Sequence, residues 1–520
     1  MATALALTAI TLAATLAMVL RAPRARAGAL ALAMIGGPVI LAIQVWDTGP
    51  VEQLRDSPPL FAAVVLVGLA VLGVGAAAFR RWPLAVPIAV ALVLPFRLPL
   101  DLGDGQPVNL LLPLYVVTGA AALAWVWERF RHDPDLPSDD PRPGFADVAL
   151  LLFVVLYAVQ SAWSIDQGKA VEQVAFFYVP FALLYVVLRT IRWTPQLAAR
   201  CLGVAVGIAL LLAAVGFYEY ATRHVLLNPR IIASNQIEDA FRVNSLFFDP
   251  NIYGRFLIIV MLGVTARMLW ARDNRTVLVT GVVLVVLWAA LVLTYSQTSF
   301  VSLLVGLAIL GGLRFGPWKA FGTVLAIGAV AAVLLFAAPS ALNINGFDSD
   351  SLDDATSGRV ALTNGGIRLF ANEPVFGVGS GAFAREYRRA EHAGQSDAVA
   401  ASHTIPITIA AEQGLLGLLA YLVLLVAVLR RLLRDAEDSP ARAGIAAMVI
   451  ALVVHTMGYA AFLEDPVLWV LLAVGGSLAA VGGGAATGAV GGGPRREPRM
   501  PRPARPRRKR RTTFTESDPG

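Results

Sequence analysis

Arginines in two polar segments are the residues of this sequence whose type and placement best suit chemistry. Arg242 lies in "AFRVNSLFFDPNIYGRFL" (240–257), and Arg359 and Arg368 lie in "TSGRVALTNGGIRLFANEPVFGVGSGAF" (356–383). A guanidinium group can bind phosphate through two parallel hydrogen bonds, a geometry that lysine does not reproduce. Each arginine is therefore either an anion ligand or a solvated side chain that faces lipid headgroups.

Three further polar residues lie at or near predicted helix starts. The Asp-Pro-Asn turn at 249–251 is typical of a cap on a helix that begins near Ile252, because Asp and Asn accept hydrogen bonds from free helix N–H groups. His403 precedes an apolar run, and Glu412 lies two to three turns inside that run. The histidine is either a cap or a proton acceptor, and an ionisable group inside a span is by default functional.

The composition is that of an integral membrane protein. Of the 520 residues, 57% are hydrophobic and only 15% are charged, and the mean hydropathy is +0.68. Apolar runs of the length that crosses a bilayer as a helix recur along the chain, without the alternation typical of barrel strands. We expect an all-α, polytopic transmembrane helical bundle of about 15 spans at 3–20, 28–46, 60–79, 82–96, 108–127, 146–163, 171–188, 197–217, 252–271, 276–294, 299–313, 317–337, 406–429, 443–462 and 466–482.

The short loops predict the orientation of these spans in the cytoplasmic membrane. One alternate set of loops carries nineteen Lys and Arg residues, and the opposite set carries three, Arg55, Arg97 and Lys169. The positive set is expected in the cytoplasm, which places the N-terminus outside and the C-terminus inside. The basic tail at 494–511 then meets anionic membrane lipids, with nucleic acid as the minor alternative.

This topology predicts four regions. They are N-terminal transmembrane helices at 1–217, a core at 218–429 with long outer loops at 218–251 and 338–405, C-terminal transmembrane helices at 430–482, and a disordered basic tail at 483–520. Loops of such length are functional or disordered, so chemistry is expected outside the membrane.

Several kinds of site are not indicated. Cys201 is the single cysteine, and no two histidines have zinc-binding spacing. The acidic cluster at 348–354 lacks the glycine and terminal glutamate of a calcium-binding EF-hand, and no motif for a nucleoside triphosphate occurs. We therefore expect no metal and no cofactor.

Three sequence blocks together resemble the O-antigen ligase and O-antigen polymerase superfamily. The first is "RVNSLFFDPNIYG" (242–254), which resembles the family's arginine followed by Pro-Asn and glycine at a helix start. The second is Ser-Gly-Arg at 357–359 with "PVFGVG" (374–379). The third is Ser-His at 402–403 with "EQGLLG" (412–417), where threonine follows the histidine in place of the usual asparagine.

The resemblance implies a GT-C-like membrane glycosyltransferase that ligates or polymerises a surface polysaccharide of the cell envelope. It would take a glycan from undecaprenyl pyrophosphate and join it to a hydroxyl of an acceptor glycan or lipid, outside the cytoplasmic membrane. Arg242 and Arg359 would stabilise the departing pyrophosphate without a metal, and His403 would accept the acceptor proton. The remaining candidates for substrate binding are Arg368, Asn251 and Glu412.

Rival classes differ in what they require. A flippase or transporter favours charges at mid-span and repeated halves, and a metal-dependent GT-C enzyme favours paired carboxylates in its first outer loop. The segment 47–59 offers Asp47, Glu52 and Asp56, none adjacent. Both classes remain as alternatives to the metal-independent transferase.

Overall fold

Helices form the framework of this protein in the computed structural model, which describes residues 2–46, 49–101, 107–131, 140–226, 241–319, 322, 359–391, 404–459, 461–490 and 520. The N-terminal helices are α1 (Ala2–Val19), α2 (Pro23–Val45), α3 (Gly49–Arg55), α4 (Pro58–Arg81), α5 (Ala85–Val93), α6 (Leu112–Arg131), α7 (Phe145–Gln160), α8 (Gln167–Gln173) and α9 (Val179–Thr190), the last two joined by a π-helical turn at Val174–Tyr178. The others are α10 (Pro195–Thr222), α12 (Pro250–Leu269), α13 (Asn274–Val292), α14 (Gln297–Phe315), α17 (Arg359–Asn372), α18 (Phe383–Glu391), α19 (Ile405–Leu433), a 3-10 turn at Ala436–Asp438, α20 (Pro440–His455) and α21 (Pro466–Val490).

Many of these helices have the length and apolar composition of membrane-spanning segments. In the described part of the chain, eight helices are long and apolar enough to cross a membrane, and four shorter ones are apolar as well. The chain is thus a polytopic helical membrane protein. The count of about 15 spans stays a prediction, because the run 82–96 forms only the nine-residue α5 and the run 317–337 lies almost wholly outside the described residues.

One exception to the all-helical expectation follows α5. Strands β1 (Leu98–Asp101) and β2 (Pro107–Leu110) form an antiparallel hairpin in which Leu98 is opposite Leu110. The predicted region boundaries also fall inside helices. Helix α10 continues to Thr222 and α19 to Leu433, because their last turns remain helical beyond the apolar run.

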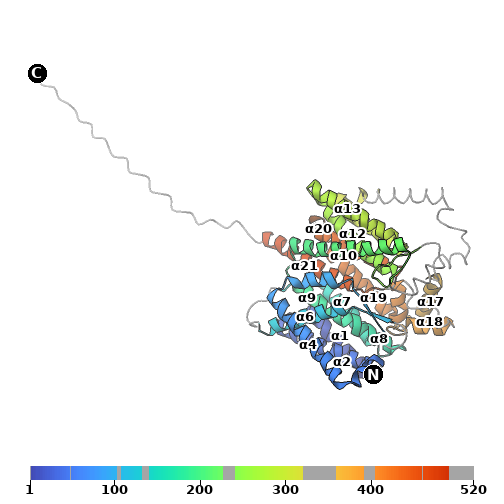
Figure 1. The fold of residues 1–520 in the computed structure, drawn as a ribbon. Helices are drawn as coiled ribbons and strands as arrows, with labels where there is room; N and C mark the ends of the chain where they lie inside the picture. The colour runs from blue at the N-terminus through green and yellow to red at the C-terminus, as the bar shows by residue number, and fades with distance from the viewer. Residues whose placement is uncertain are drawn as a thin grey trace, which may run out of the picture. The chain divides into compact units, whose positions relative to one another are not determined.

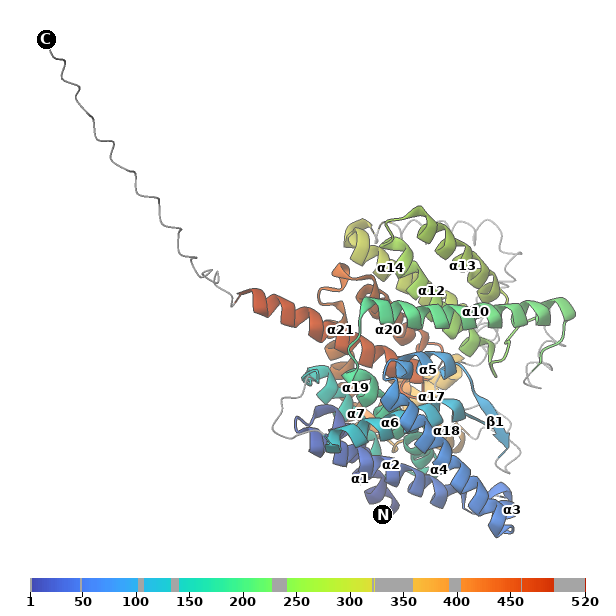
Figure 2. The same cartoon turned by 60° about the vertical axis from the view of Figure 1, so that its left-hand side comes forward.

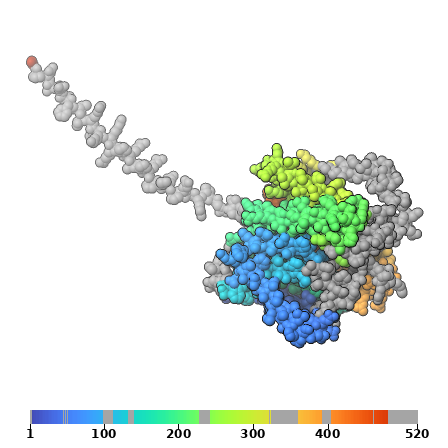
Figure 3. All heavy atoms as spheres, in the orientation of Figure 1, coloured from blue at the N-terminus to red at the C-terminus, as the bar shows by residue number. Residues whose placement is uncertain are grey.

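The helices pack in two groups that share α19 (Figure 1, Figure 2). In the first, α1 packs on α2, α7 and α9, while α6 packs on α2, α4 and α9. In the second, α12 packs on α10, α13, α14 and α20. Helix α19 contacts both α7 and α20, and α17 lies on α19. Figure 3 shows α10 as a continuous green band across one face, between α12–α14 and the N-terminal helices.

Two ends of the bundle are distinguished here by the segments attached to them. At the loop end, α10 ends and α12, α14 and α19 begin; at the tail end, α19 ends and α20 begins. In the predicted topology the loop end faces outward and the tail end faces the cytoplasm.

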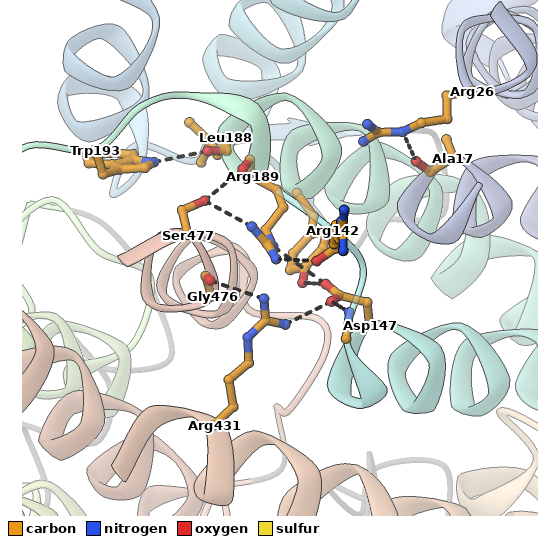
Figure 4. A network of polar contacts seen from close by, with 12 residues as sticks. Ala17, Arg26, Arg142, Asp147, Leu188, Arg189, Trp193, Arg431, Gly476 and Ser477 are labelled. Atoms are coloured by element: carbon orange, nitrogen blue, oxygen red, sulfur yellow. Dashed lines mark hydrogen bonds and ion pairs between the residues drawn. The ribbon is translucent and has the colours of Figure 1, made fainter. Parts of the chain in front are cut away.

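A buried charge network ties four helices together at the tail end (Figure 4). Asp147 of α7, only 1% exposed, lies 2.8 Å from Arg431 Nη1 of α19 and 3.6 Å from Arg189 Nε of α9. Arg431 also donates to the Gly476 carbonyl of α21, at 3.0 Å, and Ser477 Oγ donates to the Arg189 carbonyl at 2.6 Å. We call Asp147, Arg189 and Arg431 the tail-end clamp. It fixes α7, α9, α19 and α21 relative to one another.

The segment Val481–Gly520 is a separate compact unit. Of it, the structure describes the end of α21 and Gly520. The predicted basic tail thus lies mostly outside the described residues.

Candidate active site

Hydrogen bonds to backbone carbonyls and to a buried carboxylate hold the segment that carries Arg242 at the loop end. Arg242 Nε donates to the Thr294 carbonyl at 3.2 Å, and Val243 N donates to the Leu293 carbonyl at 3.0 Å. The fully buried Glu219 of α10 accepts from Ser245 N at 2.7 Å. The segment of the expected outer loop that carries Arg242 is therefore anchored between the end of α10 and the end of α13.

Asn251 begins a chain of hydrogen bonds between three helices. The carboxylate of Asp249 accepts from Asn251 N at 2.6 Å and caps α12, as its sequence predicts. The Asn251 side-chain carbonyl accepts from Ser296 Oγ at 2.8 Å, and Ser296 Oγ lies 2.8 Å from Ser299 Oγ. Ser299 Oγ lies in turn 3.2 Å from His455 Nε2 at the end of α20.

We call Asn251, Ser296, Ser299 and His455 the serine–histidine cluster. Both serines and the histidine are at most 1% exposed. The approach of α12 to α14 requires a glycine here, because a Cβ on Gly254 would lie 2.6 Å from Ser299 Oγ. The cluster is thus a buried polar contact between α12, α14 and α20 at the loop end.

Helix α19 starts beside this contact. Ile405 N donates to the Thr456 carbonyl at 3.1 Å, and Thr404 Oγ1 donates to the Met457 carbonyl at 3.2 Å. These acceptors directly follow His455 in the sequence. The candidate base His403 itself lies outside the described residues, and so do the serine and glycine that precede Arg359.

A second polar group, the loop-end charge cluster, contains the buried Arg255 and Asp465 and the half-buried Arg97 and Tyr459. Arg255 Nε of α12 lies 3.1 Å from Asp465 Oδ2, with both side chains about 5% exposed or less. The Arg255 guanidinium also lies 5.5 Å from the centre of the Tyr459 ring. Burial lowers the pKa of Arg97, an effect opposed by Asp465 and reinforced by Arg255. Arg242 binds the carbonyl of Thr294, two residues before Ser296, and so lies at the same end of the bundle.

The segment after Ser-Gly at 357–358 forms α17, Arg359–Asn372, which ends two residues before Pro374, because a proline disfavours the helical conformation of the residue before it. Arg359 begins this helix. Leu362 and Leu369 are buried in a small core with Phe383 and Tyr387 of α18. Arg368 points away from that core and binds Glu391 Oε1 through its Nε and Nη2, at 3.0 and 2.7 Å, on the surface.

The second and third sequence blocks interlock. Helix α19 is broken at Gly414, whose φ of 65° and ψ of −161° suit glycine alone. The turn at 374–379 replaces the lost helical bonds, since Leu415 N donates to the Pro374 carbonyl at 2.8 Å and Gly379 N donates to the Glu412 carbonyl at 2.9 Å. The stretch 374–381 is called the glycine turn below.

Both carboxylate oxygens of Glu412 are engaged in the same interlock. They accept from Gly381 N at 3.0 Å and Phe383 N at 3.1 Å, at the start of α18. A carboxylate at a helix start also interacts favourably with the helix dipole. In the described structure the Glu412 carboxylate thus binds backbone N–H groups, and its expected contact with substrate remains a prediction.

Sequence reasoning missed most of the buried partners. The serine–histidine cluster joins residues from distant segments, and nothing local marks Ser296 or Ser299. Arg255 and Asp465 were detectable in principle, because each is an ionisable residue at the end of an apolar run. Within the described ranges, no three His, Cys, Asp or Glu side chains are grouped as metal ligands would be.

The fold and this polar end define a multi-pass membrane protein with a buried polar site where its loops attach. Residues 282–422, just over a quarter of the chain, match the family model described as O-Antigen ligase, which confirms the resemblance to the O-antigen ligase and O-antigen polymerase superfamily. The matched segment covers the second half of α13, all of α14, α17 and α18, and the first part of α19. No curated protein matches the chain.

Proposed function

We propose that this protein transfers a glycan from undecaprenyl pyrophosphate to an acceptor hydroxyl, at the outer face of the cytoplasmic membrane and without a metal ion. The observation that carries the proposal is the convergence at the loop end. Arg242, the serine–histidine cluster and the start of α19 meet there, in a chain whose residues 282–422 match the O-antigen ligase family.

Arg242 and Arg359 are assigned to the pyrophosphate. As the glycan leaves, negative charge grows on the carrier, and two guanidinium groups can stabilise it through charge-assisted hydrogen bonds. Support comes from the arginines at this end of the bundle, where Arg97 and Arg255 lie with Asp465 and Arg242 binds the Thr294 carbonyl. Asn251, at the start of α12, orients the same substrate. Arg368 could bind the pyrophosphate only after its ion pair with Glu391 is broken.

His403 is assigned as the general base. The acceptor oxygen forms a bond to the anomeric carbon of the glycan, the bond from that carbon to the pyrophosphate oxygen breaks, and the hydroxyl proton passes to the imidazole. Support comes from Thr404 and Ile405, which directly follow His403 in the sequence and attach to the end of α20 beside the serine–histidine cluster.

An apolar cavity suits the hydrocarbon chain of the carrier. It has a volume of ≈ 570 Å³ and is lined by side chains of α5, α10, α12, α20 and α21, among them Leu202, Phe256, Met448 and Val470. The lining runs along α12 from Phe256, one residue after Arg255, to Arg267, and it includes Pro440 at the start of α20, so the cavity extends towards the tail end. A lipid chain that enters at the Phe256 end would have its pyrophosphate on the side of the loop end.

The predicted topology and regions complete the proposal. The loop end faces outward, the tail end and basic tail face the cytoplasm, and the core at 218–429 does the chemistry. Glu412 acts as a positioning residue in this scheme, because it holds the glycine turn and α18. No nucleotide is required, since the lipid pyrophosphate is already an activated leaving group.

Transfer in proteoliposomes tests the function. Purified protein, lipid-linked glycan extracted from the source cells and radiolabelled acceptor should give a labelled glycan product in the presence of EDTA. Loss of product in EDTA, with recovery on adding a divalent cation, would favour a metal-dependent enzyme. Movement of the donor across the bilayer without a new glycosidic bond would favour a flippase.

A further inference from the structure

An open hollow of ≈ 530 Å³ lies where the glycine turn meets the α7–α8 connection and α18. Trp163 and Phe376 form its aromatic wall, with their rings edge to face and their centroids 6.1 Å apart. Both side chains are exposed, at 43% and 55%. Glu373, Glu386 and Arg389 form its polar wall.

Hydrogen bonds between distant segments hold these walls in place. Gln160 of α7, three residues before Trp163, donates to the Phe376 carbonyl at 3.2 Å. Arg385 of α18 donates to the Ile165 carbonyl at 2.6 Å. The hollow is thus formed before any ligand arrives, which lowers the entropy cost of binding.

The chemistry of the walls points to a sugar. A sugar ring has a face of C–H groups that packs on an aromatic ring and an edge of hydroxyls that donate hydrogen bonds. The Glu386 side chain is 22% exposed, and its buried Oε2 lies 3.8 Å from Arg389 Nη1 without a hydrogen bond to any described residue. The carboxylates of Glu373 and Glu386 are the hydrogen-bond acceptors that this wall offers to hydroxyls.

Charge excludes the competing anions. Two carboxylates, Glu373 and Glu386, face one guanidinium, Arg389, so the hollow repels a pyrophosphate or an anionic headgroup. A role of Trp163 as a simple interface anchor would explain its exposure. It would not explain a rigid hollow in which an aromatic pair faces carboxylates.

We propose that this hollow is a saccharide subsite that takes a non-acidic sugar of the glycan, away from the reacting unit. The inference rests on the proposed function. Arg359 begins the 14-residue α17 and Glu373 follows its last residue, so the helix separates them by about 20 Å. The subsite therefore binds the glycan several sugar units beyond the bond that is made or broken, and it selects for the length and sugar type of the chain.

Binding of carrier-free glycan tests the subsite separately from transfer. The probe is the oligosaccharide released by mild acid from the lipid-linked pool of the source cells, labelled at its reducing end. Trp163→Ala and Glu386→Gln should each weaken its binding to the detergent-solubilised full-length protein by about tenfold or more. Trp288→Ala, which removes an exposed tryptophan of α13, is the matched control and should bind as wild type does.

Two probes distinguish the source of the sugar. The released donor glycan and the acceptor purified from the cell envelope are titrated in parallel, and the one that loses affinity in Trp163→Ala occupies the subsite. No binding of either probe to wild-type protein, or equal binding to wild type and both variants, overturns the proposal.

The transfer assay separates this inference from the function beneath it. With a long-chain substrate, Trp163→Ala should raise KM about tenfold with little change in kcat. If wild type binds the glycan through Trp163 but transfers nothing, the proposed function fails and the subsite stands. If Trp163→Ala transfers and binds as wild type does while Arg359→Ala is inactive, the subsite fails and the function stands.

Discussion

Glu412 accepts a hydrogen bond from the backbone N–H of Phe383 at 3.1 Å, across 29 residues of sequence. This bond fixes the start of α18 to the first third of α19. The glycine turn contacts the same part of α19. The Glu412 contacts and the break at Gly414 therefore belong to one structural unit. The glycine pattern of these blocks is thus explained by the close approach of two backbones.

Gly414→Ala should disrupt this unit. The added Cβ would lie 2.3 Å from the Val375 carbonyl oxygen, and the backbone conformation is one that alanine rarely adopts. The strain costs about 1–3 kcal/mol before the steric overlap is counted. We expect a clear drop in the melting temperature of the detergent-solubilised protein, with loss of transfer. Gly281→Ala, where a Cβ on helix α13 meets nothing within 4 Å, is the control and should melt at or slightly above the wild-type temperature.

Arg242→Ala and Arg359→Ala should each nearly abolish glycan transfer, while membrane insertion stays normal. Arg→Lys at either position should restore little activity, because the paired hydrogen bonds of guanidinium to phosphate are lost. Transfer in proteoliposomes and membrane fractionation measure the two properties. Arg81→Ala, at the end of α4, serves as a control for loss of a surface arginine. Wild-type rates in both alanine variants would remove the arginines from the mechanism.

His403→Ala should lower the transfer rate by about 10²–10⁴-fold, the usual contribution of a positioned general base. Binding of the lipid carrier should survive, because the arginines hold the pyrophosphate. Activity should also fall on the acid side of the pH profile, because a protonated imidazole cannot accept the hydroxyl proton. His403→Asn separates base from cap, since asparagine caps a helix well. An active His403→Asn enzyme would show that this histidine is a cap.

Asp147→Ala should destabilise the tail end strongly, because it leaves Arg189 and Arg431 buried without their carboxylate. Removing one partner of a buried ion pair costs about 3–5 kcal/mol. Thermal unfolding in detergent should show a large decrease for Asp147→Ala and almost none for Asp56→Ala, an exposed aspartate. The double variant Asp147→Ala with Arg431→Met should recover part of the loss, and equal melting of the single and double variants would argue against the clamp.

Glu464, in the turn between α20 and α21, gives a pH dependence of stability. Burial raises its pKa, an effect opposed by hydrogen bonds from Phe462 N and the Tyr178 hydroxyl. A raised carboxyl pKa in the folded state stabilises the fold fully below the unfolded value of about 4.3, and this stabilisation is lost as pH rises through the folded pKa. Glu464→Gln, which stays neutral, should therefore gain melting temperature relative to wild type more at pH 8 than at pH 5. Glu437→Gln, an exposed site, should show no such trend, and a pH-independent difference for Glu464→Gln would contradict the assignment.

Local signals in the sequence predicted the local structure well. The cap at Asp249 follows from side-chain hydrogen bonding, which needs no knowledge of the fold. The hydrophobic runs likewise predicted helices, although α5 is too short to span and a hairpin follows it.

Local sequence signals could not predict contacts between residues that are far apart in the chain. Ser299 and His455 are 156 residues apart, and their contact depends on how α14 packs against α20. The same holds for Glu412, whose position in a span predicted function but whose partners are backbone groups that no sequence pattern identifies. Arg359 and His403 were named from their blocks, and their roles stay predictions.

The tail-end clamp has a consequence for biogenesis. Asp147 and Arg431 are 284 residues apart, so at about 5–20 residues per second the ribosome completes Arg431 on the order of 15–60 s after Asp147. During that interval the carboxylate of α7 must enter the bilayer without its closest cation. Arg189 of α9 emerges much sooner and is the first partner that can neutralise it. Co-translational assembly would thus proceed by pairing α7 with α9 first, and α19 would complete the charge group only when nearly the whole bundle has been made.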